Sequence, residues 1–274
     1  TTGDNNVAVG HTAGTALTTG GDNVIIGKAA GIALTNNNYN VAIGASAFSS
    51  ANASEEANVV IGYSAGSSID NASTAYNVII GYTAGVGGSA YLANCVVIGM
   101  NAMKSTAANN QTGTVAIGHS ALKELTSGAG NLAVGYEALK VHTTGARNMA
   151  IGYGAMNDTD GDANILASED NIFIGYDAGG GTWTGSLGNS SDDTDRNVGI
   201  GNYVMDAAMD NANDNVGLGY QALSALTQGD YNIAIGSEAA DALTTVSGVV
   251  AIGHQAMSIG VGGADAIGIG RSAL

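Results

Sequence analysis

The acidic residues in the middle of the chain are the group best suited to bind a metal ion. Residues 158–164 read DTDGDAN, and Glu169 follows at the twelfth position counted from Asp158. Oxygen ligands at alternate positions with a glutamate at the twelfth are typical of a calcium-binding loop, but Ala163 replaces the glycine that such a loop needs at its sixth position. Two interpretations remain open, a solvated acidic turn and a calcium site with the ligands Asp158, Asp160, Asp162, Asn164 and Glu169.

A second stretch with recognisable chemistry holds the only tryptophan, Trp183, between the glycine-rich residues 179–181 and Gly185. A tryptophan exposed in a glycine-rich loop could stack on a sugar ring or anchor a protein partner. The alternative is that Trp183 covers the apolar base of its own loop. The sequence therefore predicts a candidate ligand contact at Trp183 and leaves the packing interpretation open.

Catalysis needs a nucleophile, a base and an orienting group in one place, or a defined set of metal ligands. His11, His119 and His254 occupy equivalent positions of a repeat, but His11 and His119 are six copies apart, roughly 29 Å at about 4.8 Å per strand. We find no catalytic arrangement and predict that the chain is not an enzyme. In other copies the repeat position of these histidines holds a tyrosine, which predicts either aromatic stacking between rungs or a recognition stripe. These tyrosines are Tyr63, Tyr82, Tyr136, Tyr153, Tyr176 and Tyr220.

The elements that position these residues are copies of one repeat, N-[VILM]-x-[VIL]-G-x-x-A, as in residues 40–47. The copies return at a short and nearly constant spacing from one end of the chain to the other, which is typical of a solenoid. The sequence predicts an all-β chain, a parallel β-solenoid of about 15 rungs, a rung being one turn of the coil. We expect one repeat domain over 1–274 with loop insertions at about 157–170 and 179–196. The repeat glycines are Gly10, Gly27, Gly44, Gly62, Gly81, Gly99, Gly118, Gly135, Gly152, Gly175, Gly201, Gly219, Gly236, Gly253 and Gly270.

Within one repeat, Val41 and Ile43 share a face of the strand and Ala42 points the other way. Stacked on their equivalents, these pairs form two aliphatic ladders that we expect to be the core. The glycine suits a corner with positive φ, and stacked asparagines such as Asn40 can hydrogen-bond along the axis. The predicted repeat-core residues are Val41, Ile43, Gly44, Ala47, Val78, Ile80, Gly81 and Ala84.

Composition limits the partners of the chain. The net charge of −16 comes from 23 acidic and 7 basic residues, which argues against nucleic acid as a ligand. No segment approaches the roughly 18 apolar residues of a membrane helix, so we expect no membrane insertion in this segment. The single cysteine, Cys95, replaces the repeat asparagine and excludes an intrachain disulfide.

The sequence NVAIG at residues 40–44, followed by ASA, resembles the head repeat of trimeric autotransporter adhesins, typified by the Yersinia adhesin. The likeness spans essentially the whole chain, and similar repeats occur in phage tail fibres and other secreted bacterial fibres. This resemblance implies a left-handed parallel β-roll, a homotrimer of chains packed side by side, and binding to a cell-surface or matrix glycan or protein. The chain departs from the family in its longer repeat and its aspartate-rich insertions.

A head-to-tail filament is the alternative form of self-assembly. If Leu274 were followed by Thr1 of another copy, the interval from Gly270 to the next Gly10 would be slightly shorter than the common period. This interval would form one short rung across the junction of the two copies. The leading hypothesis is a structural extracellular fibre or adhesin-like shaft on a cell or virion surface. The alternative is a receptor- or glycan-binding module that uses the insertions at 157–170 and 179–196.

Overall fold

The chain is a parallel β-solenoid, and the predicted fold class is confirmed. The computed structural model describes residues 3–52, 55–71, 73–88, 91–106, 110–159, 168–184, 193–259 and 263–274. Within these ranges every regular element is a β-strand. The same ranges contain no helix that could span a membrane. The chain divides into two compact units, Thr1–Asn131 and Leu132–Leu274.

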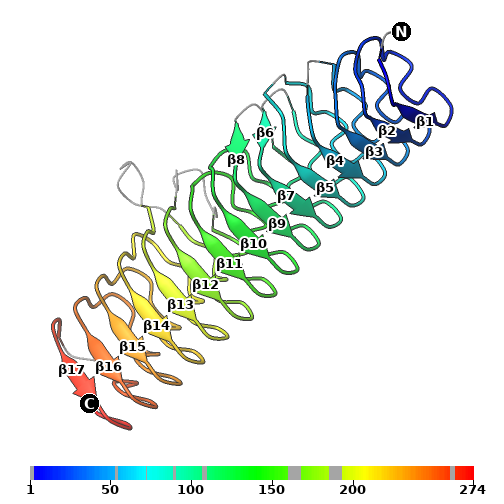
Figure 1. The fold of residues 1–274 in the computed structure, drawn as a ribbon. Helices are drawn as coiled ribbons and strands as arrows, with labels where there is room; N and C mark the ends of the chain where they lie inside the picture. The colour runs from blue at the N-terminus through cyan, green and yellow to red at the C-terminus, as the bar shows by residue number, and fades with distance from the viewer. Residues whose placement is uncertain are drawn as a thin grey trace. The chain divides into compact units, whose positions relative to one another are not determined.

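In the first unit, three-residue strands stack in parallel, one on each rung (Figure 1). The register does not slip: Val41 pairs with Val59 and Ile43 with Ile61, and neighbouring strands repeat this match. Two shorter strands, β6 (Leu92–Ala93) and β8 (Gln111–Thr112), form a separate parallel pair. The stacked strands are β1 (Val7–Val9), β2 (Val24–Ile26), β3 (Val41–Ile43), β4 (Val59–Ile61), β5 (Val78–Ile80), β7 (Val96–Ile98) and β9 (Val115–Ile117).

The second unit is built in the same way and absorbs the two long insertions without losing register. Met149 pairs with Ile172, and Ile172 pairs with Val198, although both intervals are longer than the common period of the repeat. The strands on either side of each insertion therefore keep the pairing of the regular rungs. The strands are β10 (Leu132–Val134), β11 (Met149–Ile151), β12 (Ile172–Ile174), β13 (Val198–Ile200), β14 (Val216–Leu218), β15 (Ile233–Ile235), β16 (Val250–Ile252) and β17 (Ile267–Ile269).

In every three-residue strand after β1, the middle residue is buried in the coil and the two residues beside it point outward. Ala42 is fully buried, while Val41 and Ile43 are only half-buried. Burial alternates in the same way in β5. The repeat-core prediction was therefore wrong for Val41, Ile43, Val78 and Ile80, which lie on the outer face of the sheet. Side chains alternate between the two faces of the strand as expected, but the small middle residue faces the interior and the large flanking residues face outward, the reverse of the prediction.

In most rungs the size of the middle strand residue is matched by the residue six positions later. The small Ala42 is followed by the large Phe48, and both are fully buried. The large Phe173 is followed by Gly179, where an added Cβ would lie 2.8 Å from the Phe173 ring. In these rungs one filled volume is shared between the two positions, as close packing demands, whereas at Ala234 and Ala240 both buried residues are small. The same exchange pairs Ile25 with Gly31, Ile79 with Gly85, Ala116 with Leu122 and Ala133 with Leu139.

The repeat glycine forms the corner after the strand. Gly44 has φ of 130° and Gly81 has φ of 141°. A Cβ on Gly81 would lie 2.5 Å from the carbonyl oxygen of Gly99 on the next rung. Positive φ and close backbone approach both require glycine here, as predicted. Three residues after each glycine, Ala47 and Ala84 are buried, as the core prediction requires.

The repeat asparagines form the predicted amide ladder inside each unit. Asn40 Oδ1 accepts hydrogen bonds from the Nδ2 and backbone N–H of Asn58, at 3.1 and 3.0 Å. In the second unit, Asn197 Nδ2 donates to Asn171 Oδ1 at 3.2 Å. These side chains are buried, where a polar group is tolerated only if it is bonded. The amide ladder therefore holds each rung in register with the next.

Candidate functional site

The outward-facing strand residues form an aliphatic surface in each unit, which we call the outer sheet face. In the described three-residue strands each of these residues is Val, Ile, Leu or Met. Ile200, Ile233 and Ile235 are 42%, 38% and 37% exposed. Parallel sheets are normally covered on both faces, and large contiguous apolar patches mark interaction sites. The outer sheet face is therefore the first candidate site.

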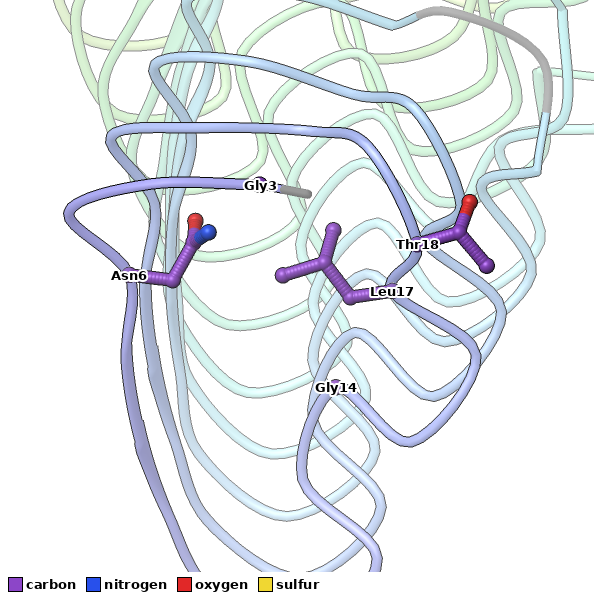
Figure 2. Close-up of a pocket in the computed structure, with 5 residues that line it drawn as sticks. All are labelled: Gly3, Asn6, Gly14, Leu17 and Thr18. Atoms are coloured by element: carbon purple, nitrogen blue, oxygen red, sulfur yellow. The ribbon is translucent and has the colours of Figure 1, made fainter. Parts of the chain in front are cut away.

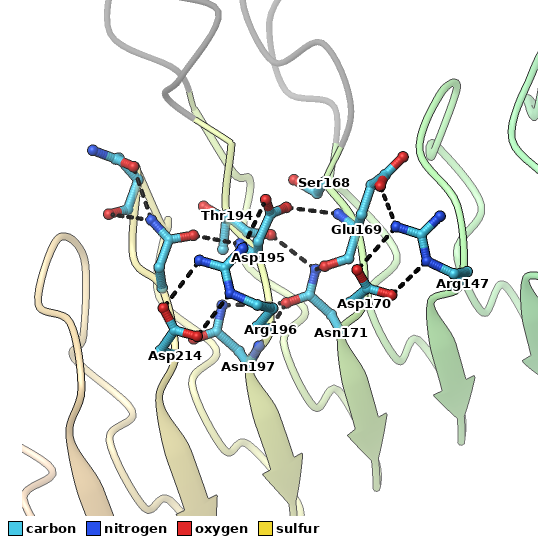
Figure 3. Close-up of polar contacts among 12 residues, drawn as sticks. Arg147, Ser168, Glu169, Asp170, Asn171, Thr194, Asp195, Arg196, Asn197 and Asp214 are labelled. Carbon is cyan, nitrogen blue, oxygen red and sulfur yellow. Dashed lines mark hydrogen bonds and ion pairs between the residues drawn. The ribbon is translucent and has the colours of Figure 1, made fainter.

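Alternating arginines and aspartates connect successive rungs of the second unit (Figure 3). Arg147 donates two hydrogen bonds to the carboxylate of Asp170, at 2.6 and 2.9 Å. Arg196 donates two to Asp214, at 2.7 and 3.0 Å. These bonds hold the pKa values of Asp170 and Asp214 below the usual range of aspartate. We call these four residues the ionic ladder.

The ionic ladder lies where the two insertions rejoin the coil. Glu169, which also pairs with Arg147, donates its backbone N–H to Asp195 Oδ1 at 2.7 Å. Asn171 Nδ2 donates to the carbonyl oxygen of Thr194 at 2.8 Å. The end of the first insertion is thus bonded to the end of the second. Sequence reasoning missed this group, although each of its four members directly precedes a repeat asparagine.

The structure brings no predicted calcium ligands together in the part of the chain that it describes. Asp158 Oδ2 accepts a hydrogen bond from Thr182 Oγ1 at 2.6 Å, and Glu169 is paired with Arg147. Among the described residues, no three His, Cys, Asp or Glu side chains are close enough to hold one metal ion. The other predicted ligands, Asp160, Asp162 and Asn164, lie outside the described residues.

Trp183 is a core residue, which corrects the predicted ligand contact. Its side chain is fully buried, and its ring meets Phe173 edge to face, with centroids 5.8 Å apart and planes at 63°. Its backbone N–H donates to the carbonyl oxygen of Asp158 at 2.9 Å. Trp183 therefore packs beneath its own insertion, and the packing interpretation is the right one. A buried ring cannot contact a ligand at the surface.

Tyrosines that follow the repeat glycine stack from rung to rung, as one of the two interpretations predicts. The Tyr136 and Tyr153 ring centroids are 4.8 Å apart with planes at 9°, and those of Tyr153 and Tyr176 are 5.3 Å apart with planes at 10°. Tyr63 and Tyr82 stack at 5.2 Å in the first unit. In the second unit the stack continues into a tyrosine row, consisting of Tyr136, Tyr153, Tyr176, Tyr203 and Tyr220.

A pocket of about 210 Å³ lies at the first described rung (Figure 2). Leu17 lines it, and its equivalent one rung later, Leu34, is fully buried in the coil. The pocket is therefore continuous with the coil interior. Its lining residues carry no ionisable side chain and are Gly3, Asn6, Gly14, Leu17 and Thr18.

Two buried residues, His142 and Cys95, carry side chains with acid–base or nucleophilic chemistry. His142, which sequence reasoning did not single out, is buried with Nδ1 2.9 Å from Thr159 Oγ1. Cys95 is buried in the asparagine column, and its burial raises the pKa of the thiol. Its backbone N–H still donates to Asn77 Oδ1 at 2.9 Å, so Cys95 continues the amide ladder.

The fold and its exposed surfaces define the class of the chain, a β-solenoid repeat protein. Comparison with protein-family models, with curated proteins and with solved structures gave no match for this chain. The likeness to adhesin head repeats therefore rests on the repeat residues alone.

Proposed function

We propose that this chain is a structural subunit of an extracellular fibre or adhesin-like shaft on a cell or virion surface. Copies of the chain associate side by side through the outer sheet face. The observation that carries this proposal is the surface itself, because every outward position of the described three-residue strands is aliphatic and several of these side chains are exposed. Covering such a face removes apolar area from water, worth about 25 cal/mol per Å².

A second copy of the chain is the partner that best fits this face. The chain carries a net charge of −16, so two copies repel one another wherever acidic residues meet. The outer sheet face has no charged residue in its strands, which makes it the surface where copies can approach without that repulsion. Charged residues are likewise depleted at the centre of protein interfaces.

The test introduces charge into the outer sheet face of the first unit. In the double variant Val78→Lys, Ile80→Lys, the half-exposed positions can place an ammonium group in water, so the coil stays folded. We expect sedimentation equilibrium to show an oligomer for the wild type and a monomer for this variant. The control Tyr76→Lys changes a residue that is 66% exposed outside the strands, and it should remain oligomeric. A monomeric wild type, or an oligomeric double variant, contradicts the proposal.

Recognition of a receptor or glycan through the two insertions is the second candidate function. It is favoured by the bonded junction of the insertion ends, where Glu169 is bonded to Asp195 and Asn171 to Thr194, since binding loops act best when a rigid scaffold supports them. Binding of the chain to an array of matrix and cell-surface glycans tests it. Replacing residues 160–167 and 185–192 by short glycine-serine links should abolish the binding and leave self-association unchanged. Binding that survives both replacements rules this function out.

A further inference from the structure

The second unit carries most of the negative charge of the chain. Residues 132–274 contain 17 acidic and 4 basic side chains, a net charge of −13, whereas residues 1–131 contain 6 acidic and 3 basic, a net charge of −3. Three of the four cations are already paired within the unit, Lys140 with Glu137, Arg147 with Asp170 and Arg196 with Asp214. The surface of this unit thus presents carboxylates and few free cations.

The tyrosine row lies on this acidic unit, with Tyr203 half-buried and its other members exposed to solvent. Tyr136, Tyr153, Tyr176 and Tyr220 are 42%, 53%, 45% and 46% exposed. The first three rings are stacked face to face. At Tyr203 the orientation changes, because its plane makes an angle of 64° with Tyr176 and 90° with Tyr220. Neither Tyr176 nor Tyr220 is therefore stacked on the face of the Tyr203 ring.

Carboxylates accompany the tyrosine row at short range. Glu137 directly follows Tyr136, and its negative charge is the main cause that raises the pKa of the Tyr136 hydroxyl. Asp177 directly follows Tyr176, and its backbone N–H donates to the Tyr153 carbonyl oxygen at 2.9 Å. Glu238 donates its backbone N–H to the Tyr220 carbonyl oxygen at 2.8 Å. The carboxylates of Glu137 and Asp177 thus act on tyrosines of the row, since the pKa of Tyr203 is raised by partial burial and also by the charge of Asp177.

We propose that the tyrosine row and its flanking carboxylates bind an arginine- and lysine-rich segment of another protein. A guanidinium stacks on an uncovered tyrosine face and pairs with a carboxylate at the same time, which an ammonium does less well. The chain has only 7 basic residues, so a second copy offers no such segment. This inference concerns a different surface from the outer sheet face and does not rest on self-association.

Titration calorimetry with short oligoarginine and oligolysine peptides tests the proposal. We expect the wild type to bind oligoarginine more tightly than oligolysine, and binding to weaken as salt is raised. The double variant Tyr176→Ser, Tyr203→Ser should bind oligoarginine about tenfold more weakly. Tyr176→Phe, Tyr203→Phe keeps the rings and should bind like the wild type.

The first unit supplies a matched control. Tyr63 and Tyr82 form a stacked pair at 5.2 Å, but the residues that follow them are Ser64 and Thr83 rather than acids. Tyr63→Ser, Tyr82→Ser should therefore leave the affinity unchanged. In the second unit, Glu137→Gln, Asp177→Asn should weaken binding of both peptides. The proposal is overturned if the Tyr176→Ser, Tyr203→Ser variant binds as the wild type does, or if the Tyr63→Ser, Tyr82→Ser control loses as much affinity.

Discussion

Arg147 and Asp170 lie far apart in the sequence and are joined by two hydrogen bonds of 2.6 and 2.9 Å between adjacent rungs. The interval between them is longer than the common period, yet β11 and β12 pair in register beside them. A planar guanidinium and a planar carboxylate that meet in this way hold both distance and orientation. The pair therefore fixes the rung spacing beside an insertion, where the chain departs from its period.

Replacing Arg147 should change how the stability of the protein depends on pH. The pKa of Asp170 is lowered in the folded state by Arg147, so this pair stabilises the fold above the pKa of an unfolded aspartate, about 3.9, and the contribution is lost as the pH falls through the lowered value. Urea midpoints measured between about pH 6 and pH 2 should fall less steeply for Arg147→Met than for the wild type. Lys28→Met, in the first unit, is the control and should keep the wild-type slope. Identical slopes for Arg147→Met and the wild type would show that the pair is not formed in solution.

Removing one amide from the ladder should be costly. In Asn40→Ala, the backbone N–H of Asn58 loses its acceptor, Nδ2 of Asn58 loses one of its acceptors, and the carbonyl oxygen of Glu55 loses a donor at 2.8 Å. Buried polar groups left without partners cost about 1–3 kcal/mol each, so we expect a loss of roughly 3 kcal/mol in chemical denaturation. Asn36→Ala, at an exposed position, should cost less than about 0.5 kcal/mol. Equal costs for the two variants would mean that the ladder contributes no stability.

Two glycines separate the cost of positive φ from the cost of close approach. In Gly81→Ala, the new Cβ lies 2.5 Å from the Gly99 carbonyl oxygen, so the backbone of the next rung has to shift. At Gly113, φ is 65° and an added Cβ meets no atom within 4 Å. Gly113→Ala should cost about 1–2 kcal/mol, and Gly81→Ala should cost more or prevent folding; urea denaturation of the two variants measures the difference. A Gly81→Ala protein as stable as Gly113→Ala would refute the close stacking of these corners.

The fluorescence of Trp183 reports on the core of the second unit, because the chain has a single tryptophan. A fully buried indole beside Phe173 should emit at short wavelength and resist quenching by acrylamide until the protein unfolds. Trp183→Ala should cost about 3–5 kcal/mol, and Trp183→Phe should cost less because most of the volume is kept. Emission typical of an exposed indole in the native protein would show that the ring lies at the surface.

The repeat residues made the solenoid predictable, but they did not show which face of the strand is buried. Val41, Ala42 and Ile43 alternate large, small and large, and large aliphatic residues are usually those inside. Here the interior beside Ala42 is filled by Phe48 from the same rung. The signal was present in the sequence as a size exchange between positions six residues apart, such as Phe173 with Gly179. That exchange is visible only when the repeats are compared position by position.

The contacts made by the insertions could not be predicted from the sequence, for a different reason. Arg147, Asp170, Arg196 and Asp214 occupy the same repeat position, so their stacking follows once the register is known. Trp183, in contrast, lies in a stretch without the repeat period. No equivalent residue in a neighbouring copy therefore indicates whether its side chain faces the core or the solvent. Its burial depends on Phe173, which is the only aromatic residue at the middle strand position. Periodic residues could thus be placed from sequence, whereas the aperiodic ones needed the structure.

The amide ladder gives each unit a direction. In its links, the later asparagine donates through Nδ2 and the earlier one accepts through Oδ1, as from Asn58 to Asn40 and from Asn197 to Asn171. Amide dipoles aligned in this way polarise one another, so their effects add along the row. Within a unit, the carbonyl ends of these side chains point toward the later rungs. The interior of the coil is therefore electrically polar along its axis, although its walls are largely apolar.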